Sequence, residues 1–220
     1  MSFGDSKAII TNQPGIHENL AAIVNTHLTT EFQKPISAHT KQAFDEVDRL
    51  VKAFDGPIIL DSCCGVGQSS RIIAKQNPEA LVIGVDKSDN RITRNVEEKW
   101  QVDNFHLVRA DLNDFYRLVH AANWSVEKHY ILYPNPWPKA KHVKRRWHGS
   151  AVFPYIFKIG KELELRSNWR LYLEEFQAAL AIANITSTLD EVDSSEESLT
   201  PFEAKYQASE QQCWSLTATL

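Results

Sequence analysis

Acidic side chains follow three apolar runs of this sequence, each at the end of the run or just after it. Asp61 ends "PIILD", Asp86 ends "ALVIGVD", and Asp111 follows "FHLVRA". Gly65 and Gly67 stand between the first acid and a helical stretch, and glycines there let a backbone turn tightly and approach a ligand. The amides at the start of the following helix then point at that ligand. Because a strand-end acid can accept hydrogen bonds from both ribose hydroxyls, the pattern indicates a site for an adenosine-containing cofactor.

The glycine turn itself does not identify the cofactor. The dinucleotide fingerprint needs G-x-G-x-x-G, and the third glycine is absent here. The order Asp61-x-Cys63-x-Gly65-x-Gly67 resembles the acid-x-Gly-x-Gly-x-Gly turn of S-adenosylmethionine-dependent methyltransferases, with cysteine at the first glycine. A small side chain such as that of Cys63 is tolerated there if its φ stays negative. A nicotinamide or flavin dehydrogenase and a plain strand–turn–helix with a capping acid remain open alternatives.

A stiff, basic segment follows the fourth apolar run. Residues 133–148 read "YPNPWPKAKHVKRRWH" and contain no acid. Three prolines fix three φ angles and remove three backbone donors, which predicts a rigid backbone around Asn135 and Trp137. We call this stretch, residues 133–138, the Asn135 lip. Five cations follow that lip: Lys139, Lys141, Lys144, Arg145 and Arg146. Since the whole chain has a net charge of -4, the segment predicts one defined docking site for phosphates rather than general binding of polyanions.

The elements that must position these residues alternate between strands and helices. Strands are expected at 57–61, 80–86, 105–111, 128–133 and 162–167. Helices are expected over 17–28, 38–54, 71–77, 88–100, 111–123, 150–161 and 168–184. Two further β-type runs, 185–192 and 212–220, have no helix-length crossover between them and predict an antiparallel finish. The fold class is therefore α/β: a doubly wound, mostly parallel seven-stranded sheet with an antiparallel C-terminal strand.

Length and composition limit the number of domains and the class of protein. The 220 residues suit a single domain over 1–220, in which residues 1–30 are expected to be loosely ordered. No run approaches the ~20 apolar residues of a membrane span, and the start of the chain lacks a basic region followed by an apolar one. The three cysteines show no metal-ligand spacing, so we expect no metal. A reducing cytoplasm and a monomeric protein are the natural expectations.

The basic segment also carries a family resemblance. It closely resembles the P-D-P-W-x-K-x-x-H-x-K-R-R signature of the tRNA (guanine-N7)-methyltransferases. "QPGIHENL", "FQKPISAHTKQAF", "SNWRLYLEEF" and "TPFEAKYQ" are similar to other segments of that family and occur in the same order. The resemblance implies a Rossmann-like class I fold, S-adenosylmethionine as cofactor and tRNA as partner. The implied activity is that of a tRNA (guanine(46)-N(7))-methyltransferase, which forms 7-methylguanosine in the variable loop.

The resemblance also implies roles for individual residues. Asn135 would lie beside both the methyl donor and the base, as the catalytic residue. The implied cofactor-binding residues are Asp61, Gly65, Gly67, Asp86 and Asp111. The implied substrate-binding residues are Lys139, Asn168, Thr200 and Glu203. The implied phosphate-binding residues are Lys141, Lys144, Arg145 and Arg146. Thr200 and Glu203 also fit a capping box that opens a short helix.

Two positions depart from the family pattern. Asn135 and Asn168 stand where aspartates are expected. Guanine N7 attacks with a lone pair and loses no proton, so positioning, worth ~7 to 11 kcal/mol, carries most of the catalysis. Each lost charge-assisted hydrogen bond would cost ~1 to 2 kcal/mol, and Glu203 is a candidate to supply a carboxylate instead.

Two other functions stay open beside this one. A catalytically weakened paralogue that binds tRNA would explain the two asparagines. A methyltransferase acting on an exocyclic amino group would use Asn-Pro-Pro-aromatic, whereas the order here is Asn-Pro-Trp-Pro.

Overall fold

The computed structural model describes residues 6–93 and 102–220 and contains one seven-stranded sheet. Its strands are β1 (Ile58–Ser62), β2 (Leu81–Asp86), β3 (Phe105–Arg109), β4 (Val126–Leu132), β5 (Gly160–Ser167), β6 (Ser187–Glu191) and β7 (Trp214–Thr219). The spatial order is β3-β2-β1-β4-β5-β7-β6, with β1 to β5 parallel and β7 antiparallel to both of its neighbours. The predicted fold class is confirmed, including the antiparallel finish.

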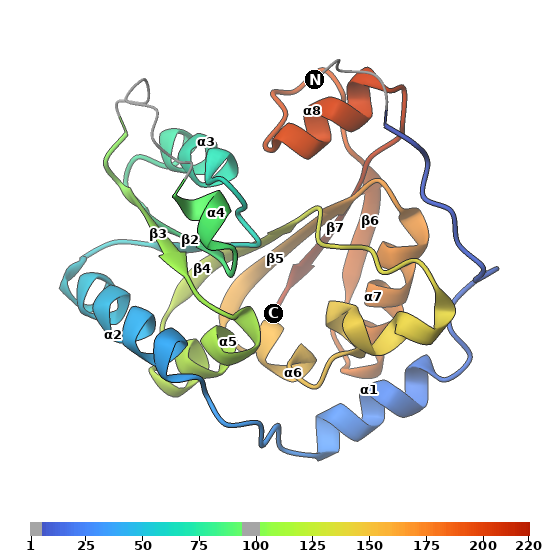
Figure 1. Cartoon of the computed structure of the whole chain (residues 1–220), viewed down its shortest axis with the longest axis horizontal. Coiled ribbons are helices and arrows are strands. Elements are labelled where there is room, and N and C mark those ends of the chain that lie inside the picture. The colour runs from blue at the N-terminus through green and yellow to red at the C-terminus, as the bar shows by residue number, and fades with distance from the viewer. Residues whose placement is uncertain (1–5, 94–101) are drawn as a thin grey trace.

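Helices cover both faces of this sheet. They are α1 (Leu20–Thr29), α2 (Ala38–Ala53), α3 (Gln68–Gln76), α4 (Asp89–Ile92), α5 (Leu112–Ala121), α6 (Phe153–Ile156), α7 (Arg170–Ile182) and α8 (Pro201–Ala208), with 3-10 turns η1 (Ala140–Arg145) and η2 (Trp147–Gly149). Figure 1 shows α1, α2, α5 and α6 below the sheet and α3, α4 and α8 above it. β1 and β2 are therefore shielded from water on two sides, as expected inside a parallel sheet, whereas the edge strands β3 and β6 are partly exposed.

Successive side chains of the strands point alternately into two separate hydrophobic cores. Leu60 and Ile131 point into the larger core, which the side chains of α1, α2, α5 and α7 complete. Ile59 and Tyr130, their neighbours in sequence, point into the smaller core under α3. All five residues of β1 are buried. This central strand therefore has a fixed register, because a slip by one residue would exchange its two faces.

Two predicted helices differ from the observed ones. The helix expected over 150–161 is confined to α6, residues 153–156, because Gly160 already pairs with Val126 as the first residue of β5. Pro154 stands in the first turn of α6, where its missing amide breaks no helical hydrogen bond. The helix expected over 88–100 begins as α4, and its remainder at 94–101 lies outside the described residues.

The N-terminal segment lies along one side of the domain, from α8 to the lower layer (Figure 1). The Ser6 amide donates to the Ser209 hydroxyl at the end of α8, at 3.1 Å. Leu20 and Val24 of α1 are buried in the larger core. Residues 6–30 are thus docked in this structure, and the looser attachment expected for them stays a prediction about motion.

No helix among the described residues has both the length and the apolar character required to cross a membrane.

An aromatic cluster ties α2 and α5 to the sheet and allows a test of the fold. The Phe115 ring is 5.4 Å from that of Phe44 and 5.8 Å from that of Trp124, measured between centroids, and Phe115 is fully buried. Phe115→Ala should lower the free energy of unfolding by about 3 to 5 kcal/mol, through lost burial and the cavity left behind. Urea denaturation measures this, with the partly exposed Phe54→Ala as control at under about 1 kcal/mol. A loss that small at Phe115 would contradict the packing.

Candidate active site

The turn after β1 folds back tightly onto β2. The amides of Cys63 and Cys64 both donate to the Val85 carbonyl, at 2.9 and 3.2 Å. Gly67 has a φ of 77°, and a Cβ built there would lie 2.5 Å from the side chain of Leu107. Any side chain at Gly67 would therefore clash as well as strain the backbone, so the glycine predicted for close approach is required.

Cys63 corrects one sequence expectation. Its φ is 65°, so the condition of a negative φ, under which a small side chain was expected to be tolerated, is not met. An L-residue in this left-handed region costs about 1 to 2 kcal/mol, which glycine would avoid. Burial, followed by the charges of Asp86 and Asp61, raises the pKa of the Cys63 thiol to about 12. The thiol therefore stays protonated and acts as a packed side chain rather than a nucleophile.

Asp61 is fully buried at the end of β1. Its Oδ2 accepts hydrogen bonds from the hydroxyls of Ser69 and Ser70 of α3, at 2.6 and 2.7 Å. Its Oδ1 is buried and has no hydrogen-bond partner among the described residues. Burial raises the pKa of Asp61 to about 6, although the two hydroxyls oppose the shift. A buried carboxylate with one unused oxygen is suited to a cationic ligand group, which would restore its charged form.

Asp86 at the end of β2 holds the glycine turn. Its Oδ2 accepts from the Gly65 amide at 3.2 Å, and its Oδ1 accepts from the Ser88 amide at 2.7 Å. Arg91 of α4 donates to the same Oδ2 at 3.0 Å, and its side chain is 57% exposed. A ligand hydroxyl that reaches Asp86 must therefore compete with a solvent-facing guanidinium, which is a weak and displaceable partner.

Asp111 follows β3 and begins α5. Its Oδ1 accepts from the Asn113 amide at 2.9 Å, which caps the helix, and its own amide donates to the Thr40 hydroxyl of α2 at 3.1 Å. Its side chain remains 35% exposed, 3.9 Å from Lys34. Because β1, β2 and β3 are neighbours with parallel register, Asp61, Asp86 and Asp111 lie along one edge of the sheet, as predicted.

The basic segment leaves the adjacent strand, β4, at the same edge. β4 pairs with β1 so that Ile131 lies opposite Ser62, one residue beyond Asp61. Tyr133 and Trp137 have φ values of 50° and 46°, and each precedes a proline. Asn135 is exposed between these two strained positions, where its Oδ1 accepts from the Trp137 amide at 3.4 Å. Such strain persists only where the surroundings fix it, and it clusters at functional sites.

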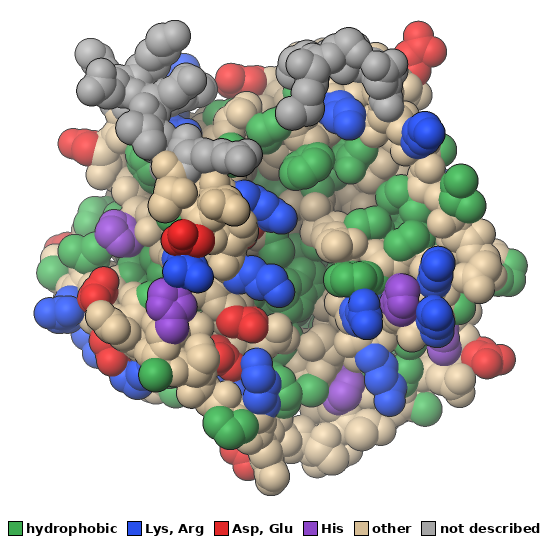
Figure 2. Space-filling model, viewed as in Figure 1, with side chains coloured by type: hydrophobic (Ala, Val, Ile, Leu, Met, Phe, Trp, Pro, Cys, Tyr) green, Lys and Arg blue, Asp and Glu red, His purple; other side chains and the backbone are tan. Residues whose placement is uncertain are grey.

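Four of the five predicted phosphate-facing cations are exposed: Lys139, Lys141, Lys144 and Arg145. Figure 2 shows Lys and Arg side chains gathered on the right of this face and others near its centre. The Arg145 guanidinium lies over the Trp137 ring, 4.7 Å from its centroid. This cation–π contact fixes Arg145 beside the lip that carries Asn135.

Arg146 corrects the prediction that all five cations face solvent. It is fully buried and forms an ion pair with the equally buried Glu175 of α7. Its guanidinium also lies 4.9 Å from the centroid of Trp169. His148, at the end of the basic segment, is buried too, with its Nε2 2.9 Å from Glu175 Oε2. Neither residue can reach an RNA phosphate here.

Of the predicted substrate residues of the C-terminal half, Thr200 and Glu203 are buried and Asn168 is partly exposed. The Thr200 hydroxyl accepts from the Glu203 amide at 3.0 Å and caps α8, which confirms the capping interaction. The Glu203 carboxylate is 1% exposed and accepts from Arg166 at 3.1 Å. Asn168 donates to Gln211 at 2.9 Å. Each of these three side chains is held by a neighbour in this structure, and the substrate contacts expected of them stay predictions.

Sequence reasoning missed Glu175 and Arg166, which hold Arg146 and Glu203. The signal for Glu175 was present in "YLEEF", because a helix whose apolar stripe includes Tyr172 and Phe176 must bury one of its two consecutive glutamates. A buried acid requires a buried partner.

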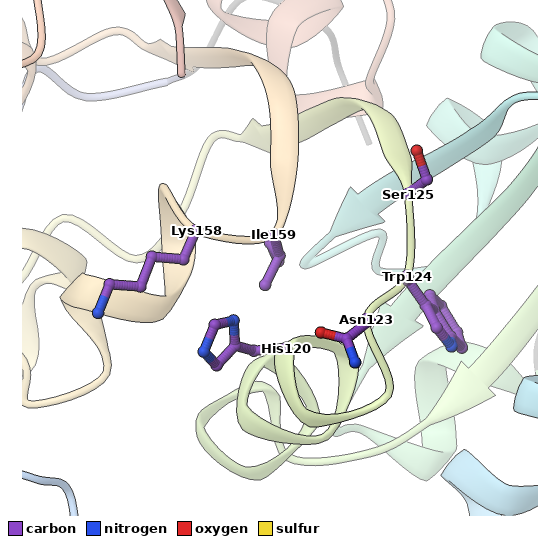
Figure 3. Close-up of a pocket in the computed structure, with 6 residues that line it drawn as sticks. All are labelled: His120, Asn123, Trp124, Ser125, Lys158 and Ile159. Carbon is purple, nitrogen blue, oxygen red and sulfur yellow. The ribbon is translucent and has the colours of Figure 1, made fainter.

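Two open surface pockets lie elsewhere. A cavity of about 310 Å³ is lined by His120, Asn123, Trp124, Ser125, Lys158 and Ile159, at the edge of the sheet where β4 and β5 begin (Figure 3). Another, of about 390 Å³, lies at the turn from α7 into β6. None of the predicted site residues lines either one. Ligands of open parallel sheets bind at the carboxyl edge, so neither cavity is the candidate active site.

The strand order, the glycine turn and the strand-end acids define a class I methyltransferase fold. The structure is similar to the 16S rRNA methyltransferase KamB, with a TM-score of 0.58 and 14% identity, covering 86% of this chain and 98% of that one. It is also similar to a 16S rRNA (adenine(1408)-N(1))-methyltransferase from Catenulisporales acidiphilia, with a TM-score of 0.56 and 17% identity, covering 80% and 90%. At these identities the likeness concerns the fold.

The family model Methyltransf_4, described as "Putative methyltransferase", matches residues 55–216, and the chain belongs to this family. A tRNA (guanine-N(7)-)-methyltransferase of Alkaliphilus oremlandii is 25% identical over 189 residues, 81% of this chain and 88% of the relative. That of Staphylococcus carnosus is 26% identical and covers 69% and 76%. That of Lachnoclostridium phytofermentans is 32% identical, over 42% and 43% of the two chains. The resemblance predicted from the motifs is confirmed.

Asp61 gives the site a testable pH dependence. Its folded pKa of about 6 lies above the ordinary 3.8, so stability is lost as the pH rises through this window and the buried group ionises. Asp61→Asn should therefore gain about 2 kcal/mol over wild type between about pH 4 and about pH 7, with no cofactor added. Urea denaturation at the two pH values measures the difference.

Asp48→Asn is the control with little pH dependence in this window. Burial opposes the shift, but hydrogen bonds from Lys52 and Trp124 lower the pKa of Asp48 below 3.8, so this carboxyl is largely ionised in the folded and unfolded states from about pH 4 upward, and the stability difference from wild type should hardly change. Equal pH dependence for Asp61→Asn and wild type would show that Asp61 is not the desolvated group.

Proposed function

We propose that this chain is an S-adenosylmethionine-dependent tRNA (guanine-N7)-methyltransferase, which forms 7-methylguanosine at guanosine 46 of the variable loop. The proposed activity is the one named for relatives that match most of the chain. One observation of the structure carries the proposal. The acids at the ends of β1 and β2 and the Asn135 lip after β4 lie at one edge of adjacent strands. We further propose that the chain is one domain that acts as a monomer in the cytoplasm.

The residues present fit this cofactor. The unpartnered Oδ1 of Asp61 would accept the methionine ammonium, and the cation would remove the cost of the buried charge. Asp86 would accept the ribose hydroxyls in place of Arg91. Gly65 and Gly67, both with positive φ, keep the turn bare of side chains, and Asp111 would meet the adenine end. When bound, S-adenosylmethionine supplies an electrophilic methyl group.

Positioning accounts for most of the catalysis we propose. Guanine N7 carries a free lone pair and loses no proton on methylation, so no residue has to act as a general base. The exposed amide of Asn135 would hold the edge of the guanine, accepting a hydrogen bond through its oxygen. The exposed Lys139, Lys141, Lys144 and Arg145 would hold backbone phosphates beside it. Holding two reactants in a productive geometry is worth ~7 to 11 kcal/mol.

A catalytically weakened tRNA-binding protein is the second candidate. The observation that favours it is the asparagine at both positions where the family pattern has aspartate, 135 and 168. Asparagine keeps an acceptor oxygen but lacks the charge that would favour the positive ring formed on methylation. The internal position of Glu203 leaves no described carboxylate in its place at the Asn135 lip.

The activity test uses unmodified tRNA, labelled methyl donor and two proteins. Wild type should form 7-methylguanosine, detected by borohydride–aniline cleavage at the modified base. Asn135→Asp should raise kcat about tenfold, because a charge-assisted hydrogen bond is about twice as strong as a neutral one. Nucleoside mass spectrometry separates the alternatives: a methylated exocyclic amino group would refute the N7 assignment, and no product from either protein would favour the weakened paralogue.

The RNA contacts have a separate signature in salt. Lys141→Ala and Lys144→Ala should each weaken tRNA binding and lower the slope of log Kd against log salt concentration by about 0.7 to 0.9. Filter binding over a salt series measures the slope. Lys41→Ala is the matched control, since Lys41 pairs with Asp45 on α2 and should leave the slope unchanged. An unchanged slope in the two loop variants would remove the loop from the interface.

A further inference from the structure

A fully buried ion pair lies beneath the basic segment. Arg146 and Glu175 both have no exposed surface, and a guanidinium nitrogen of Arg146 donates to Glu175 Oε2. Burial opposes ionisation of Glu175, but the hydrogen bonds from His148 and from the His17 amide, together with the charge of Arg146, lower its pKa to about 2. Burial lowers the pKa of His148, which is therefore a neutral donor. The charge of Arg146 is thus matched by one carboxylate at all ordinary pH values.

Arg146 uses its remaining donors on the backbone of the basic segment. Its Nε and Nη2 donate to the Trp137 carbonyl at 3.3 and 3.1 Å, and Nη2 also donates to the Lys139 carbonyl at 3.4 Å. These carbonyls flank Pro138, which has no amide of its own. One interior side chain therefore fixes the backbone between the Asn135 lip and the first exposed lysine.

The N-terminal segment holds the same stretch from outside. We define the strap as residues 11–17. The Thr11 hydroxyl donates to the Pro138 carbonyl at 2.6 Å, and Asn12 Oδ1 accepts from the Ala140 amide at 3.0 Å. Together with Arg146, the strap satisfies the carbonyls of 137, 138 and 139 and the amide of 140, a stretch that belongs to no strand.

The strap is anchored by the buried ion pair itself. Gln13 accepts from Arg146 Nη1 at 3.0 Å and donates to Glu175 Oε1 at 2.5 Å. The His17 amide donates to the same oxygen at 2.9 Å. Strap, basic segment and α7 therefore meet in one network, although 162 positions separate Gln13 from Glu175 in sequence.

We propose that the strap and Glu175 are positioning elements of the RNA site: acting through Arg146, they fix the backbone of residues 137–140 and so the direction of the exposed cations. The inference rests on the proposed tRNA substrate. Cations held in place before binding lose less conformational freedom when phosphates arrive, which favours affinity. The strap contacts neither the glycine turn nor the strand-end acids in any described hydrogen bond, so cofactor binding is independent of it.

The sharpest test changes the strap and leaves the ion pair intact. Removing one partner of a buried pair destabilises the whole domain, so Glu175→Gln is a poor probe. Thr11→Val combined with Asn12→Ala removes the two hydrogen bonds to 138 and 140 from a half-buried and an exposed residue, together with the bond that the Thr11 hydroxyl accepts from the Gln13 amide. We expect the Kd for tRNA to rise about tenfold and the salt slope to fall, because fewer phosphates are engaged at once. The Kd for S-adenosylmethionine, from calorimetry, should be unchanged.

Two comparisons make the result specific. Thr11→Ser keeps the hydroxyl and should bind tRNA like wild type. Thr29→Val with Asn19→Ala removes the same chemical groups from exposed positions whose side-chain bonds stay within five residues, and should change neither Kd nor slope.

Three outcomes would contradict one of the two proposals. A double variant with wild-type Kd and slope overturns the role of the strap. Equal loss of tRNA and S-adenosylmethionine binding also overturns it, since that result describes a destabilised fold. Wild-type protein that binds no tRNA defeats the proposed function instead.

Discussion

A guanidinium removed from water must be paired, and the pairing of Arg146 with Glu175 organises one side of this molecule. Through it, α7, the strap and the basic segment form a single rigid unit, although each segment alone is short or irregular. The prolines limit what the segment can adopt, and the ion pair selects one arrangement among those left. In the arrangement we propose, the buried charge of Arg146 fixes the direction of the exposed lysines.

The two most deeply buried carboxylates of the site region are in opposite situations. Glu175 is surrounded by donors, and its pKa is lowered to about 2. Asp61 has two hydroxyls on one oxygen and none on the other, and its pKa is raised to about 6. The first is satisfied by the fold and stabilises it. The second keeps one buried oxygen with no hydrogen-bond partner among the described residues, which is the condition expected of a group that binds a ligand at some cost to stability.

The sequence predicted the sheet well because buried parallel strands leave apolar runs, and the acids after those runs fall at one edge by topology alone. It predicted the roles of individual charges less well. Arg146 and Arg145 are neighbours in one basic run, yet one faces Glu175 and the other faces solvent, and only tertiary contacts decide between them. The helix expected near 150–161 was shortened by strand pairing at Gly160, which is a non-local effect. The left-handed Cys63 was missed because cysteine seldom adopts that conformation, and the return of the chain onto Val85 imposes it.

The contact between Arg91 and Asp86 gives ionic strength two opposing effects. A guanidinium that is more than half exposed is held by an attraction that dissolved ions screen readily. The proposed binding of an adenosine moiety at Asp86 would then exchange one partner for another, and electrolyte would ease the departure of Arg91. The same electrolyte loosens polyanions from the lysines across the edge of the sheet. Raising the ionic strength would thus favour binding of the adenosine moiety at Asp86 and weaken binding of polyanions at the lysines. Both ligands would then bind together only over an intermediate range of ionic strength.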